Sequence, residues 1–156
     1  MHYQTIIETT TNIFIGADEL QWPLLSNSFA DNVLLDYSSL SGKPAATLPA
    51  ADIIKSWESI FPGFEHTHHQ VSNFNVDEKN SEATVFCYGT ATHYLTNDSN
   101  NNIWTVVGTY NFHLTQQNGQ WKVDRMKFNF KYQDGNTGLP KLAMEKAKTS
   151  NRKAEI

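Results

Sequence analysis

The stretch FPGFEHTHHQVSNFNV, Phe61 to Val76, marks the point at which the chain changes from helical to strand-like patterns. Pro62 and Gly63 end the helical pattern before them, because proline cannot continue the hydrogen bonding of a helix interior. From His66 onward the chain consists of long segments rich in β-branched and aromatic residues. Helices first and strands second is the order typical of an α+β fold.

Three helices are predicted before this point. Apolar residues recur at helical spacing from Tyr3 to Ala17, so the first helix should end between Gly16 and Leu20. The second, Trp22 to Ala30, has Pro23 in its first turn, where proline is tolerated. The third follows Pro49. Its apolar face comprises Ile53, Ile54, Trp57 and Phe61.

A short strand, Asn32 to Tyr37, and a loop, Ser38 to Pro49, separate the second and third helices. The four long strands are predicted at His66 to Val76, Ala83 to Leu95, Trp104 to Thr115 and Trp121 to Tyr132. The turn-like runs DEKNSE, TNDSNNN and QQNGQ connect them into an antiparallel meander. Strands of about 11 to 13 residues must curve strongly to pack on so few helices. We expect one domain over residues 1–135 and a C-terminal tail over 136–156, with one or two helical turns from Leu139.

Composition excludes several classes of function. A formal charge of −4 and a pI near 5.8, without a basic stripe outside the short Lys-rich tail, argue against nucleic acid as a partner. Cys87 is the only cysteine, so no internal disulfide can form, and its apolar neighbours favour an inert core thiol. No run approaches the roughly 18 apolar residues of a membrane span, and the N-terminus lacks a secretory pattern. A cytoplasmic protein without membrane contact is therefore expected.

Four histidines indicate where chemistry could occur, since neighbouring antiparallel strands can bring them into one cavity. His66, His68 and His69 fall within four positions, and His93 lies in the next strand. His93 shares the parity of an apolar row and should face the interior, either as a satisfied core histidine or as an acid/base group. His69 lies on the opposite face from His66 and His68, which we expect at the surface. A metal site formed by His66 and His68 would lack a third ligand.

The other candidate residues each have two possible roles. Asp18 could cap the second helix or accept a hydrogen bond from a histidine in the cavity. Tyr37 could be a packed core residue, or its hydroxyl could polarise a substrate carbonyl. Strand parity allows only one of Tyr110 and Asn111 to line the cavity without a bulge, and we favour Asn111. Trp57 is expected to contact the substrate from the third helix.

The chain resembles the SnoaL-like branch of the nuclear transport factor 2-like, or cystatin-like, superfamily. The residues that carry the resemblance are FADNVLLDYSSL (29–40), FPGFEHTHHQVSN (61–73), ATHYL (91–95), WTVVGTYNFHL (104–114) and GQWKVDRM (119–126). It implies a cone-shaped barrel in which a strongly curved antiparallel sheet wraps around three N-terminal helices. The scaffold hosts isomerases, dehydratases, cyclases, epoxide hydrolases and non-catalytic subunits, so function must be argued from the site.

Within that superfamily the site pattern is closest to scytalone dehydratase. The similarity rests on Asp18 four residues before a tryptophan, on Tyr37 after an aspartate, on His69 and His93, and on Asn111. Two features depart from the enzyme. Ala17 stands beside Asp18, where scytalone dehydratase has a second tyrosine. The Lys-rich tail offers no clear match to the apolar C-terminal segment that covers the pocket of that enzyme.

The resemblance implies a cofactor-independent lyase that needs no metal and acts on a small apolar or cyclic hydroxyketone. His93 would serve as general base and then acid, assisted by His69, with Asp18 orienting an imidazole and Tyr37 stabilising the enolate. The alternatives are a polyketide cyclase or isomerase using the same pocket, or a non-catalytic module that binds a small ligand. The apolar outer face of the sheet predicts a homodimer or homotrimer.

Overall fold

The structure is a computed structural model that describes residues 2–153. Its helices and strands follow one another in the order α1 (Tyr3–Asp18), α2 (Trp22–Ser28), β1 (Phe29–Asp36), α3 (Ser38–Ser41), β2 (Ala46–Pro49), α4 (Ala50–Glu58), the 3-10 turn η1 (Phe61–Gly63), β3 (His66–Lys79), β4 (Glu82–Tyr94), β5 (Ile103–Gln117), β6 (Gln120–Gly135) and α5 (Leu139–Lys153). The predicted α+β class is confirmed.

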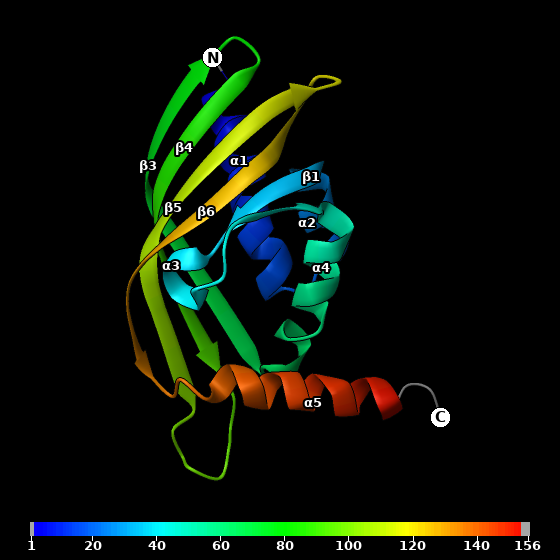
Figure 1. Cartoon of the computed structure of the whole chain (residues 1–156), viewed down its shortest axis with the longest axis vertical. Helices are drawn as coiled ribbons and strands as arrows, with labels where there is room; N and C mark the ends of the chain where they lie inside the picture. Colours follow the sequence, from blue (N-terminus) through cyan, green and yellow to red (C-terminus); the bar gives the residue numbers. More distant parts are fainter. Residues whose placement is uncertain (1, 154–156) are drawn as a thin grey trace.

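One six-stranded sheet, in the order β2-β1-β6-β5-β4-β3, forms the body of the protein. Its strands β3 to β6 are the predicted antiparallel meander. Figure 1 shows these long strands curving along one side of the molecule, with α1, α2 and α4 against the concave side and α5 across one end. The sheet is strongly curved but does not close, because its edge strands β2 and β3 do not pair with each other.

The sheet departs from a purely antiparallel arrangement at β1, which pairs in parallel with β6. The region from Ser38 to Pro49, predicted as a loop, contains α3 and β2. Strand β2 pairs with β1 through four residues only, which is too short to give a clear alternating pattern in the sequence. The second helix ends at Ser28 instead of Ala30, because the chain enters β1 at Phe29.

The C-terminal segment forms a 15-residue helix, α5, and the expectation of one or two turns was wrong. Leu139, Ala143 and Ala147 recur every four residues and are buried, so the helix packs through a narrow stripe of mostly small side chains. Leu139 and Ala143 form a cluster with Phe64 and Leu95. The other positions of α5 are mostly charged or polar, so the composition of this segment does not reveal the buried stripe.

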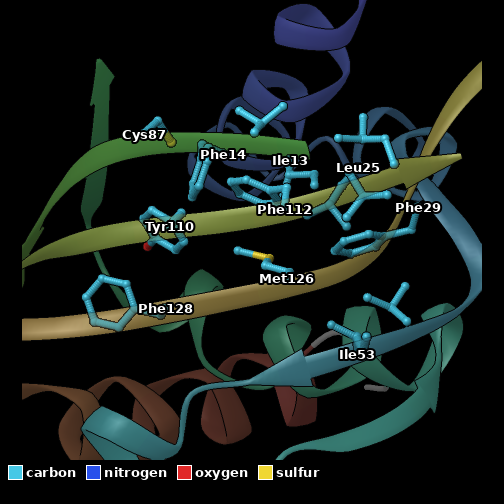
Figure 2. Close-up of a cluster of buried hydrophobic side chains, with 14 of the residues drawn as sticks. Ile13, Phe14, Leu25, Phe29, Ile53, Cys87, Tyr110, Phe112, Met126 and Phe128 are labelled. Atoms are coloured by element: carbon cyan, nitrogen blue, oxygen red, sulfur yellow. The ribbon is translucent and has the colours of Figure 1, made fainter. Parts of the chain in front are cut away.

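The main core lies between the sheet and the helices α1, α2 and α4. Figure 2 shows Ile13, Phe14 and Leu25 from the helices meeting Phe112 and Met126 from the strands. Cys87 belongs to this core, and burial raises the pKa of its thiol to about 12, as expected of an unreactive cysteine. Among residues 2–153, no helix is both long and apolar enough to cross a membrane.

Candidate active site

A cavity of about 290 Å³ lies between the helices and the concave face of the sheet. Its walls are mainly aromatic and aliphatic, with Phe14 from α1, Trp57 from α4 and Phe128 from β6 among them. Two imidazoles and two phenols, from His69, His93, Tyr37, and Tyr110, also line it. A mostly apolar cavity with a few convergent polar groups is the usual form of a small-molecule site.

Asp18, the last residue of α1, holds His69 on β3. The Asp18 Oδ1 atom lies 2.7 Å from His69 Nδ1 and accepts a second bond from the Thr67 hydroxyl at 2.8 Å. Asp18 Oδ2 accepts the His69 backbone N–H at 2.7 Å. Burial alone would raise the pKa of Asp18. The hydrogen bonds and the charge of His69, together with the bond from Thr67, outweigh burial, so the pKa of Asp18 is lowered. The carboxylate therefore stays ionised against the imidazole.

The alternative role of Asp18 as a cap of the second helix is wrong. Helix α2 has Gln21 at its N-cap position, and no side chain caps it. With Asp18 ionised, Nδ1 of His69 is its hydrogen-bond donor. In the neutral ring, Nε2 then carries the free lone pair.

His93 on β4 is buried, as its parity predicted, and is 6% exposed. Its Nδ1 lies 3.1 Å from the backbone carbonyl oxygen of Trp104, to which it donates, and its ring stacks on the Trp104 indole at 4.4 Å. Burial, aided by the charge of His69, lowers the pKa of His93 to about 4. His93 is therefore neutral at pH 7, with its ring 5.9 Å from that of His69 between centroids.

Tyr37 and Tyr110 supply the two phenols. Burial raises the pKa of Tyr37, against a smaller lowering effect of a side-chain hydrogen bond to Tyr110. Burial also raises the pKa of Tyr110 well above its ordinary value, so both remain hydrogen-bond donors. Their rings both pack against Phe128 (Figure 2 shows Tyr110 beside it). Gly89 makes room for Tyr110, since a Cβ there would lie 2.3 Å from its Cε2 atom.

Asn111 does not line the cavity, and its predicted position was wrong. It is exposed on the outer face of β5, where its Oδ1 accepts a hydrogen bond from Asn129 at 2.7 Å. Tyr110 and Phe112 are both buried, so the strand alternates regularly here and Asn111 must point outward. His66 and His68 are exposed, as expected.

Sequence reasoning missed two hydrogen-bond partners in the site, Thr67 of Asp18 and Trp104 of His93. Thr67 shares the parity of His69, which could have identified it as a second donor to Asp18. Trp104 lies directly opposite His93 in the β4–β5 register, and no sequence signal fixes that register. Within the described part of the chain, no group of three or more His, Cys, Asp or Glu residues could hold a metal ion.

Comparison with known proteins identifies the family. A family model described as a SnoaL-like domain matches residues 2–127. The chain therefore belongs to the SnoaL-like family. No match was found among the curated proteins.

Several solved structures share the fold. The Kfla4162 protein of Kribbella flavida is 24% identical, with a TM-score of 0.79 over 92% of this chain and 95% of that one. A candidate scytalone dehydratase from Novosphingobium aromaticivorans is 22% identical, with a TM-score of 0.74 over 85% and 86% of the two chains. The hexachlorocyclohexane dehydrochlorinase LinA of Novosphingobium barchaimii is 15% identical, with a TM-score of 0.68 over 86% and 89%. At these identities the likeness shows the fold alone.

Proposed function

We propose that the protein is a cofactor-independent lyase of the dehydratase type, acting on a small, uncharged cyclic hydroxyketone. The observation that carries the proposal is the pairing of Asp18 with His69 at the wall of an apolar cavity that also holds two phenols. Of the side chains that the structure describes, those lining the cavity include no lysine or arginine to bind an anionic substrate. The names of the similar structures, which include dehydratase-type enzymes, add support.

In this arrangement His69 is the better general base. The sequence had suggested His93 for that role and His69 as its assistant, so the proposal exchanges the two. The Asp18 carboxylate stabilises the imidazolium that forms when Nε2 of His69 removes a proton next to the substrate carbonyl. His93 has a pKa of about 4 and is a weaker base. Its Nε2 lone pair instead accepts a hydrogen bond from the substrate hydroxyl.

Elimination then completes the reaction. Proton removal gives an enolate, whose oxygen accepts a hydrogen bond from the Tyr37 hydroxyl, and Tyr37 in turn accepts the hydrogen bond of Tyr110. The His69 imidazolium returns its proton to the departing hydroxyl, so that the carbon–oxygen bond breaks and water leaves. No other reactant is needed to balance the step.

The test is turnover of a β-hydroxy ring ketone fused to benzene, which yields an absorbing naphthol on loss of water. His69→Gln should reduce kcat about 100-fold or more, the usual scale for a lost general base, and Asp18→Asn should reduce it less. His68→Gln, on the same strand but exposed, is the matched control and should leave turnover unchanged.

Three outcomes separate the candidate functions. Formation of the naphthol supports the dehydratase. Exchange of the α-proton without loss of water favours an isomerase or cyclase on the same cavity. Saturable binding with neither reaction favours a module that binds small ligands.

A further inference from the structure

Helix α3 is a single turn that forms one wall of the cavity. It follows β1 directly, with Tyr37 at its N-cap, and both Tyr37 and Leu40 line the cavity. The turn packs mainly against β6 (Figure 1). A four-residue helix has little stability of its own. The contacts that hold α3 on β6 therefore also hold Tyr37, its N-cap residue, in place.

The Ser39 hydroxyl joins α3 to β6 by two hydrogen bonds. It donates to the backbone carbonyl of Phe128 at 2.8 Å and accepts the backbone N–H of Phe130 at 2.9 Å. The β1–β6 ladder ends just before this point, at the pair Asp36 and Lys127. The hydroxyl thus occupies the position of one more β1 residue and satisfies two backbone groups that the ladder leaves free.

The neighbouring serines bond to residues that lie two to four positions away in the chain and not to β6. Ser38 donates from its N–H and its hydroxyl to Asp36. The Ser41 hydroxyl donates to the Tyr37 carbonyl and accepts the Lys43 N–H. Within residues 2–153, the side-chain hydrogen bonds from α3 to β6 are therefore those of Ser39.

We propose that Ser39 is a positioning residue: its hydroxyl fixes α3 on β6 and thereby sets the place of the Tyr37 phenol in the cavity. The consequence for catalysis rests on the function proposed above, whereas the consequence for Tyr37 itself does not. Ser39 touches no substrate in this scheme. It acts through the backbone between residues 37 and 39.

A double-mutant cycle tests the coupling. Ser39→Ala should lower kcat/KM about tenfold, and Ser39→Thr, which keeps the hydroxyl, should restore most of it. Tyr37→Phe should lower kcat/KM at least as much, and the double variant should fall no further than Tyr37→Phe alone. Ser41→Ala is the matched control and should match the wild type. Additive losses would overturn the proposal, because they would mean that Ser39 acts independently of Tyr37.

A second measurement needs no turnover. In protein labelled with 3-fluorotyrosine, the Tyr37 signal in the ¹⁹F spectrum is assigned from its loss in Tyr37→Phe. Ser39→Ala should shift or broaden this signal, while Ser41→Ala leaves it unchanged. A Tyr37 signal unaltered by Ser39→Ala would overturn the proposal even if the enzyme is active, and a shifted signal supports it even if no substrate is found.

Discussion

His93 couples the stability of this protein to pH. Its pKa is about 4 in the folded state against an ordinary value of 6.5. Between these values the unfolded chain takes up a proton that the folded protein does not, so the free energy of unfolding should fall as pH drops from 6.5 to 4. The shift corresponds to roughly 3 kcal/mol. Asp18, whose pKa is lowered from 3.8, contributes only below this window.

Urea unfolding at intervals from pH 7 to 4 measures this effect. His93→Phe should show a flatter dependence of the free energy of unfolding on pH than the wild type, because the buried titrating group is gone. The exposed His68→Gln variant should keep the wild-type slope. Equal slopes in the wild type and His93→Phe would contradict the assignment of a depressed pKa.

Single residues differ in how far their sequence context determines their place. The apolar row around His93 was enough to predict that it faces inward, because alternation along a strand is regular. The choice between Tyr110 and Asn111 depended on whether β5 carries a bulge between Trp104 and Tyr110, which no local signal decides. The pairing of Asp18 with His69 joins residues 51 positions apart and required the resemblance to be proposed at all.

At the scale of elements, α5 depends on a glycine in η1. A Cβ on Gly63 would lie 1.8 Å from the backbone oxygen of Ala143, which cannot rotate away as a side chain can. Gly63→Ala should therefore displace α5 and cost about 1 to 3 kcal/mol of stability. Hydrogen exchange should show lost protection in α5, with the amides of β4 and β5 unchanged as the internal control. Unaltered protection of α5 would show that the helix does not pack as described.

The long strands and the helix α1 were predicted well, whereas β2, α3 and the C-terminal helix α5 were predicted poorly. Four strands and the helix α1 have sustained periodic patterns that leave little ambiguity. Strand β2 and helix α3 have four residues each, too few for any period to appear. Helix α5 is stabilised by a stripe of small side chains that composition alone does not distinguish from a solvated tail.

For the whole molecule, we propose association through the outer face of the sheet. Tyr88 and Tyr132 are 48% and 57% exposed, and Lys131 Nζ lies 5.2 Å from the centre of the Tyr88 ring. Aromatic side chains exposed to this extent favour burial against a second copy. Light scattering at micromolar concentration should give a dimer or trimer of the 17.7 kDa chain, and Tyr88→Glu should shift it towards the monomer. A monomeric wild type would contradict the proposal.

The parallel pairing of β1 with β6 also constrains how the chain folds during synthesis. Phe29 lies opposite Val123, 94 residues later in the chain, so β1 has no partner on this side until β6 has left the ribosome. Helices α1, α2 and α4 precede β6 and can cover the face of β1, but the edge of β1 that pairs with β6 stays unpaired until then. Contacts this distant in sequence slow folding, and an unpaired strand edge is the part of a partly folded chain that is prone to aggregate.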